Sequence, residues 1–178
     1  PENKNCEGLY PEWDDAHPRW SEALAFLEEY SDGLPDPIPG YDQRDSRYLV
    51  ATFKGDIVGE LRLIVIPIGP ENDLPAVKVD GQELLQAKVM EFVVLPQFRR
   101  RGIGTKLQES AMTLARSLGC YQLASFIYSG NAANHMLKLS MGFAVRPESR
   151  GDEAHGLYFI MPLRPDALPP EPPADRHG

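Results

Sequence analysis

Residues 89–119, VMEFVVLPQFRRRGIGTKLQESAMTLARSLG, constrain the fold of this 178-residue chain more than any other segment. An apolar run ends at Leu95-Pro96, three consecutive arginines follow, and Gly102-Ile103-Gly104 leads directly into an amphipathic helical pattern. A strand that passes through a glycine turn into a helix presents backbone N–H groups and the positive end of the helix dipole. The segment therefore predicts an anion site, and a ligand that carries phosphates suits it.

Two common nucleotide-binding motifs do not fit these residues. A dinucleotide fingerprint needs a third glycine where Leu107 stands, and a P-loop needs lysine before Ser/Thr, whereas Thr105 precedes Lys106. The remaining pattern, Arg99-x-x-Gly102-x-Gly104, lets a ligand approach the backbone where no Cβ intervenes. The arginines add charge and bidentate donors for phosphate. The alternative interpretation is a plain strand–helix turn beside a solvated basic patch.

The spacing of apolar and turn residues predicts three helices and a mixed sheet. We expect helices at 19–30, 105–118 and 131–141, and strands at 47–53, 57–66, 88–95, 121–128, 143–146 and 156–163. A small additional hairpin is expected around residues 80–81. The strand–helix–strand over 88–128 implies a parallel pair with a crossover, whereas the flanking hairpins are antiparallel. The predicted fold class is therefore α/β (α+β).

Length and composition favour one domain, 1–164, followed by a proline-rich tail, 165–178, that we expect to be extended or mobile. No apolar run approaches the ~20 residues that span a bilayer, so no membrane association is expected. The two cysteines form neither a disulfide framework nor a metal-binding spacing. The default expectation is a cytoplasmic protein without a metal.

The net charge of −8 is concentrated near the N-terminus. Residues 1–36 hold ten acidic and two basic residues, and the rest of the chain is balanced. This segment is either a solvated, solubilising face or an acidic rim that attracts a cationic substrate. Both interpretations disfavour a nucleic-acid partner, because binding phosphates over a long stretch requires a broad basic surface.

The stretch VVLPQFRRRGIGTKL resembles the acetyl-CoA-binding motif of the Gcn5-related N-acetyltransferases (GNAT), Gln/Arg-x-x-Gly-x-Gly/Ala. A second segment, SGNAANHMLKLSMGF, resembles another signature of this family, in which an asparagine, here Asn131, opens a helix that ends at Gly142-Phe143. The two motifs together cover residues 88–145. The resemblance implies a twisted, mixed sheet with helices on both faces and a splayed parallel pair at its centre. It also implies transfer of an acetyl group from acetyl-CoA, as cosubstrate, directly to a primary amine.

The resemblance also implies which residues bind the cosubstrate. Backbone amides of the turn would hold the CoA pyrophosphate, and Arg100 and Arg101 would reach the peripheral phosphates. Backbone groups of Val93 and Val94 would pair with the pantetheine arm like an added strand. Asn131 either contacts that arm or only caps its helix. The expected set is Val93, Val94, Arg99, Arg100, Arg101, Gly102, Ile103, Gly104, Thr105 and Asn131.

Direct transfer requires an uncharged amine, an oxyanion donor and a proton for the departing thiolate. A backbone N–H of residues 93–94 is the candidate donor. Glu91 is the first candidate base, with an ion-paired glutamate as the alternative interpretation, and Glu60 is the second. Many members of the family carry a tyrosine seven residues after the helix-opening asparagine, where this chain has Lys138. Tyr128 is a candidate substitute as the acid; alternatively it is a packed aromatic.

Two further functions stay open at this level. One is an acyl-CoA-binding sensor or regulatory module with the same fold and little catalysis, for which Lys138 is the only hint. The other is an acyltransferase that accepts longer acyl groups. The family builds its acceptor pocket from variable segments, here 10–45, 67–87 and 147–155. The sequence therefore allows a polyamine, an aminoglycoside or a lysine-bearing peptide as acceptor, and a monomer or a homodimer as the assembly.

Overall fold

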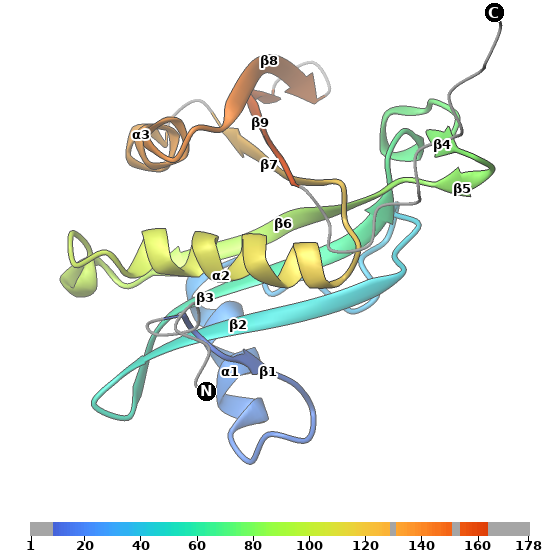
Figure 1. Cartoon of the computed structure of the whole chain (residues 1–178). Helices are drawn as coiled ribbons and strands as arrows, with labels where there is room; N and C mark the ends of the chain where they lie inside the picture. Colours follow the sequence, from blue (N-terminus) through green and yellow to red (C-terminus); the bar gives the residue numbers. More distant parts are fainter. Residues whose placement is uncertain (1–8, 129–130, 151–153, 164–178) are drawn as a thin grey trace, which may run out of the picture.

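The computed structural model describes residues 9–128, 131–150 and 154–163. Its centre is a seven-stranded sheet in the order β1-β2-β3-β6-β7-β9-β8, beside a separate hairpin of β4 and β5 (Figure 1). The strands are β1 (Glu12–Trp13), β2 (Asp45–Phe53), β3 (Asp56–Pro67), β4 (Lys78–Val79), β5 (Gln82–Glu83), β6 (Leu85–Val94), β7 (Gln122–Tyr128), β8 (Ala144–Arg150) and β9 (Ala154–Pro162). The helices are α1 (Trp20–Tyr30), α2 (Ile103–Ser117) and α3 (Ala132–Ser140), with short 3₁₀ turns η2 (Pro70–Asn72) and η3 (Pro96–Phe98).

The predicted mixed sheet is confirmed. All neighbouring strands of the large sheet are antiparallel except β6 and β7, which are parallel and are joined through α2. Helix α2 begins at Ile103, two residues before the predicted start, because Gly102 already adopts the left-handed conformation from which the helix enters. The edge strand β1 was not predicted, since two residues leave no alternation to detect.

The parallel pair splays, as the resemblance implied. Residues 86–89 of β6 pair with residues 122–125 of β7, and no further pairing between the two strands follows. Residues 90–94 of β6 therefore keep β3 as a neighbour on one side and have no strand partner on the other among the residues that the structure describes. Strands β7, β9 and β8 turn away from β6 toward the top of Figure 1. The divergence leaves backbone groups of β6 free to bind an extended ligand.

A buried polar cluster holds the closed end of this pair. Gln122 of β7 donates a hydrogen bond to Gln86 of β6 over 2.8 Å. Glu71 accepts from Gln86 over 2.7 Å and from the Tyr158 hydroxyl over 2.6 Å, and it forms an ion pair with Lys88. Burial opposes ionisation of Glu71, but the Lys88 charge and these hydrogen bonds hold the pKa of Glu71 below its ordinary value. The cluster ties the η2 loop, β6 and β9 together, so the pair opens only at its other end.

Helices cover both faces of the sheet, as expected. Helix α2 crosses in front of β6, β3 and β2 in Figure 1, and its Leu107, Ala111 and Ala115 are fully buried in the main core. Helix α3 lies on the same side, because a Cβ added to Gly104 would stand 3.4 Å from the Leu137 side chain. Helix α1 packs on the opposite face, where Phe26 and Leu27 meet Tyr48. Each face of β6 is therefore covered by different helices.

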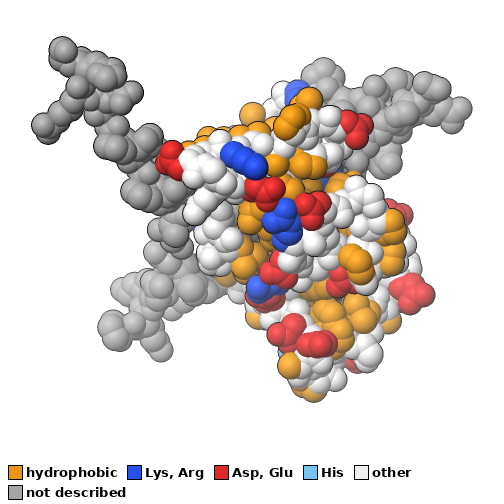
Figure 2. Space-filling view, turned by 90° about the vertical axis from the view of Figure 1, so that its right-hand side faces the viewer, with side chains coloured by type: hydrophobic (Ala, Val, Ile, Leu, Met, Phe, Trp, Pro, Cys, Tyr) orange, Lys and Arg blue, Asp and Glu red, His pale blue; other side chains and the backbone are white. Residues whose placement is uncertain are grey.

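The surface of the described residues is mixed in charge. Figure 2 shows acidic, basic and apolar side chains interspersed on the face that it displays. Exposed ion pairs such as Arg44 with Asp42, at 2.9 Å, and with Glu83, at 2.8 Å, contribute little to stability because water and salt screen them. None of the described helices is long and apolar enough to cross a bilayer. The tail that the sequence predicts at 165–178 lies outside the described residues.

Candidate functional site

A cavity of about 470 Å³ lies where the predicted anion site was expected. Its walls come from the free end of β6, from the η3–α2 turn and from the start of α3. The lining residues are Phe92, Val94, Phe98, Arg99, Arg100, Gly102, Ile103, Gly104, Thr105, Asn131, Ala133, Asn134 and Leu137. The two sequence motifs are therefore adjacent in space, and eight of the ten residues that the resemblance implied line this one cavity, which we call the donor cavity.

The turn that enters α2 has the geometry of an anion-binding nest. Arg100 has φ +63° and Gly102 has φ +79°, so two left-handed residues alternate with others just before the helix. The N–H groups of the first helical residues, 103–105, have no intrahelical acceptor. A Cβ at position 102 would meet nothing within 4 Å, so lack of space does not explain the glycine there. The positive φ does, because residues with side chains rarely adopt it.

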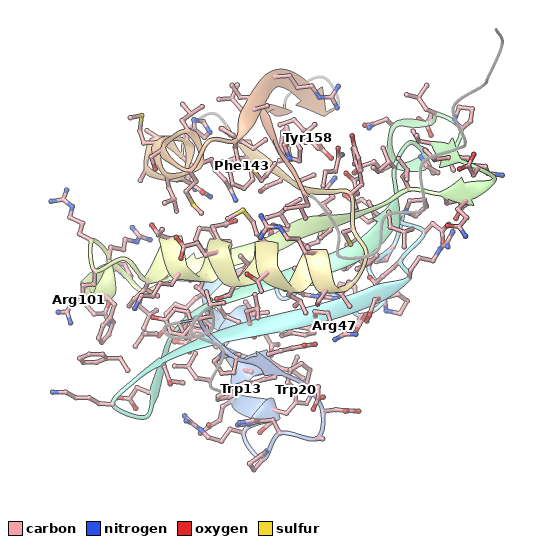
Figure 3. All side chains as sticks on the ribbon, viewed as in Figure 1. Trp13, Trp20, Arg47, Arg101, Phe143 and Tyr158 are labelled. Carbon is pink, nitrogen blue, oxygen red and sulfur yellow. The ribbon has the colours of Figure 1, made fainter. Side chains whose placement is uncertain are left out.

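The three arginines of the turn do different things. Arg99 and Arg100 line the donor cavity, and Arg99 Nε donates to the carbonyl of Val94 over 3.2 Å. Arg101 does not line it. Its guanidinium lies 5.3 Å from the ring centroid of Phe98 and 5.7 Å from that of Phe53, at the end of the molecule where α2 begins (Figure 3). Of the two side chains expected at the peripheral phosphates, only Arg100 faces the cavity in this structure.

Of the two interpretations of Asn131, the structure shows the helix cap, and contact with the pantetheine arm stays a prediction. Its Oδ1 accepts a hydrogen bond from the N–H of Asn134 over 3.3 Å, so it caps α3. It also lines the donor cavity. Val93 lies on β6 beside this cavity, but its side chain packs on the α1 face. Only its backbone could therefore pair with the pantetheine arm, as predicted.

A second cavity, of about 240 Å³, lies on the α1 face of β6. It is enclosed by α1, by the segment after α1 and by strands β2, β3 and β6. Its lining residues are Leu24, Leu27, Glu28, Gly33, Leu34, Tyr48, Arg62 and Glu91. We call it the acceptor cavity. It contains Glu91, the first candidate base, and five of its eight lining residues belong to segment 10–45, one of those that the sequence assigned to the acceptor.

Arg62 organises the acceptor cavity, and sequence reasoning missed it. The side chain is 1% exposed and donates to the carbonyls of Leu34, over 2.8 Å, and Pro35, over 3.0 Å. Its Nη1 lies 3.6 Å from Oε2 of Glu91, which also accepts from Leu34 N–H through Oε1. The guanidinium also stands 5.1 Å from the ring centroid of Tyr48. The feature of the sequence that could have indicated this role is the one arginine within the largely apolar strand predicted at 57–66.

Glu60 lies deeper on the same face of the sheet. It is fully buried opposite Val93, and neither carboxyl oxygen has a hydrogen-bond partner among the described residues. Burial, and then the charge of Glu91, raise its pKa to about 9. Glu60 therefore carries its proton at neutral pH. Glu91 is paired with Arg62, so the two candidate bases lie on the same face of the sheet in different surroundings.

The structure says less about the group that could protonate the departing thiolate. The backbone of Tyr128 pairs with Gly156 in β9, but its side chain lies outside the described part of the molecule, so its role stays a prediction. Lys138 is fully buried on α3, and burial lowers its pKa to about 7. Cys120 is also buried, which raises the pKa of its thiol to about 12 and makes it a poor nucleophile.

Comparison with known proteins agrees with this arrangement. The model of the acetyltransferase (GNAT) family matches residues 7–143. No curated protein sequence matches the chain. The solved structures that resemble it include Arabidopsis thaliana NAA60 in complex with a bisubstrate analogue, with a TM-score of 0.55 and 16% identity over 68% of this chain and 77% of that one.

Two further solved structures are similar. A putative acyl-CoA N-acyltransferase from Klebsiella pneumoniae has a TM-score of 0.58 and 17% identity, and the match covers 88% of this chain and 99% of that one. Nourseothricin acetyltransferase has a TM-score of 0.52 and 24% identity, over 68% and 67% of the two chains. At these identities the likeness concerns the fold.

Proposed function

The chain belongs to the acetyltransferase (GNAT) family of acetyl-CoA-dependent N-acetyltransferases, and we propose that it transfers the acetyl group directly to a primary amine. The observation that carries this proposal is the pair of cavities on opposite faces of β6. They are separated by residues 90–94, the part of β6 that lacks a partner in β7. A thioester bound along this free edge would be accessible from both faces.

The donor cavity supports acetyl-CoA as the cosubstrate. The turn offers free N–H groups at a helix N-terminus, and Arg100 faces the cavity, so it can bind a pyrophosphate. The unpaired edge of β6 can accept the amide-containing pantetheine arm as an added strand. Acetyl-CoA occupies the similar structure of Arabidopsis NAA60, at 17% identity.

The acceptor cavity supports an amine as the acceptor. Arg62 balances the charge of Glu91 on its wall, and the carboxyl group of Glu28 is left over, which favours a cationic head group. The attacking amine must lose a proton, and we infer that Glu91, which lines this cavity, takes it directly or through water. Glu60, which keeps its own proton near neutral pH, is better suited to hydrogen bonding than to acting as the base.

Direct attack is favoured over a covalent enzyme intermediate. Cys120, the one cysteine within the described residues, is buried with its pKa raised to about 12, so its thiolate is scarce. A backbone N–H of the free edge of β6 can stabilise the oxyanion that forms when the amine attacks. The amine proton passes to Glu91, the acetyl group passes to nitrogen, and the sulfur departs as thiolate.

A free-thiol release assay tests this function. Acetyl-CoA is incubated with the protein and a panel comprising a polyamine, an aminoglycoside and a lysine-bearing peptide, and released CoA is measured. We expect amine-dependent release with at least one class, and a lower kcat for Glu91→Gln at saturating acetyl-CoA. Tight calorimetric binding of acetyl-CoA without release for any amine would instead support a sensor.

A further inference from the structure

The size and the walls of the acceptor cavity limit the amines that it can hold. Its volume of about 240 Å³ lies below the ~300–1,000 Å³ of pockets that enclose drug-sized ligands. An amine built from several rings, such as an aminoglycoside, can therefore enter only in part. Leu24, Leu27 and Leu34 form much of the wall, together with the ring of Tyr48. These side chains favour an acceptor that is small and carries methylene groups, whose burial against them is favourable.

The buried end of this cavity offers an oxygen that lacks a hydrogen-bond donor. The Glu91 side chain is 1% exposed, and its Oε2 has no donor among the described residues. Arg62 Nη1 lies 3.6 Å from this oxygen, beyond the ~2.7–3.2 Å of a good hydrogen bond. Burying a carboxylate oxygen without a donor is costly, so this oxygen suits a ligand that brings an N–H group. An amine therefore fits beside Glu91, next to the free edge of β6.

The open end of the cavity carries the charge that the protein leaves over. Glu28, on α1, is exposed, whereas Arg62 and Glu91 are buried. Arg62 is the one cation among the described lining residues, and it already has Glu91 at 3.6 Å and Asp36 at 3.5 Å. No lining residue therefore balances Glu28. The cavity is net negative, and its excess negative charge lies at the mouth, where it attracts a second cation.

We propose that the acceptor is a small aliphatic diamine, bound with one amine beside Glu91 and the other, as an ammonium, beside Glu28. This inference rests on the proposed acetyl transfer. The amine beside Glu91 forms a bond to the acetyl carbon and gives one proton to Glu91 or to water, while CoA leaves as the thiolate. The distal ammonium keeps its proton and only binds. Glu28 is therefore a specificity-determining residue, and the product retains one positive charge.

Other classes of amine match less of this cavity. The lysine side chain of a peptide supplies methylene groups and one ammonium, but its other end is an uncharged backbone, which leaves Glu28 without a partner. An aliphatic monoamine leaves Glu28 unpaired for the same reason. An aminoglycoside carries several cations, but its polar rings replace the methylene groups that the three leucines favour. A diamine supplies a positive charge at each end and an apolar middle.

Matched acceptors test the charge at the mouth. CoA release is measured with 1,4-diaminobutane, 1-aminobutane and 4-amino-1-butanol, which share the chain and one amine and differ at the far end. Wild-type kcat/KM, halved for the two equivalent amines of the diamine, should exceed that of either other compound by about fivefold. Glu28→Gln should reduce this preference to about twofold or less. Glu29→Gln removes the same charge one residue away, outside the cavity lining, and should keep the preference.

Binding provides a readout that does not require turnover. In calorimetry on the complex with CoA, 1,4-diaminobutane should bind more tightly than 1-aminobutane, and Glu28→Gln should lose this difference while its Kd for CoA stays unchanged. If no amine releases CoA but this difference is found, the proposed transfer fails and the diamine assignment stands. Three results would overturn the assignment: no difference between diamine and monoamine, an undiminished preference in Glu28→Gln, or a higher kcat/KM for a lysine-bearing peptide than for the diamine.

Discussion

Glu91 and Phe92 are consecutive residues of β6 whose side chains line different cavities on opposite faces of the sheet. Alternation along a strand produces this arrangement, and the loss of pairing with β7 leaves the backbone between them free. Acceptor chemistry on one face and donor chemistry on the other are therefore separated by a single strand. Substitutions on one face should change one substrate's binding without changing the other's.

Arg100 and Arg101 provide a matched test of the phosphate site. Arg100 faces the donor cavity, whereas Arg101 packs on Phe53 and Phe98. Losing a charge-assisted hydrogen bond costs about 1.5–3 kcal/mol, so Arg100→Glu should raise the Kd for acetyl-CoA by about 10–100-fold in calorimetry.

Arg101→Glu is the control, because it reverses the same charge one residue away. Its effect should be about threefold or less and should shrink further as salt is added, since only a screened charge remains. Equal losses for the two variants would show that general charge, and not a contact from Arg100, holds the phosphates.

Gly104 should separate stability from cosubstrate binding. A Cβ added there would stand 3.3 Å from Phe92 and 3.4 Å from Leu137, both of which line the donor cavity. Alanine is favoured over glycine inside a helix by about 0.8–1 kcal/mol. We expect Gly104→Ala to be about as stable as the wild type in urea denaturation, while its Kd for acetyl-CoA rises severalfold.

Gly119→Ala should behave in the opposite way. Gly119 has φ +77° just after α2, where a side chain is strained by about 1–2 kcal/mol. This variant should be less stable and bind acetyl-CoA normally. A Gly104→Ala protein with wild-type affinity would mean that the ligand does not approach this part of the helix.

Most residues of the donor cavity could be grouped from the sequence because they are close along the chain. The strand, the glycine turn and the helix form one continuous segment, so local rules place them together. The sequence did not show which of the three adjacent arginines faces the cavity, because the position of Arg101 depends on Phe53, which is distant in sequence.

The acceptor cavity could not be predicted in the same way. Arg62 joins β3 to residues 34–35 and to Glu91 of β6, and no spacing rule connects these segments. The different surroundings of Glu60, which has no hydrogen-bond partner among the described residues, and of Glu91, which is paired with Arg62, also depend on the folded sheet. Long-range packing determines these features, and a single sequence shows them only as unusual polar residues in apolar strands.

Arg62 should be required to keep the acceptor cavity in order. Removing one partner of a buried ion pair costs about 3–5 kcal/mol, because the remaining charge stays buried. Arg62→Met leaves Glu91 unpaired and frees the segment at Leu34, so the free energy of unfolding should fall by about that amount. The KM for the amine should rise, whereas the Kd for acetyl-CoA should not change.

A double substitution shows whether the pair itself is responsible. Adding Glu91→Gln to Arg62→Met removes the unpaired charge and should restore part of the lost stability in urea denaturation. Strictly additive losses for the two substitutions would mean that Arg62 acts only through the carbonyls of Leu34 and Pro35.

Glu60 should make stability depend on pH. Its pKa is about 9 in the folded protein and near the ordinary 4.5 in the unfolded chain, so the folded state holds a proton that the unfolded chain releases. The free energy of unfolding should therefore fall by up to about 1.4 kcal/mol per pH unit from about pH 5 upward. Above pH 7, Lys138 opposes this trend, because its pKa is lowered on folding.

The range from pH 5.5 to 7.0 thus isolates Glu60. Across it, urea denaturation should show the wild type losing about 2 kcal/mol more than Glu60→Gln, in which the amide replaces a protonated carboxyl without a titrating group. Glu60→Gln should also keep more activity than Glu91→Gln, because a carboxyl that is already protonated cannot accept the amine proton. Equal pH dependence in the wild type and Glu60→Gln would show that Glu60 is ionised in the folded protein and would restore it as a candidate base.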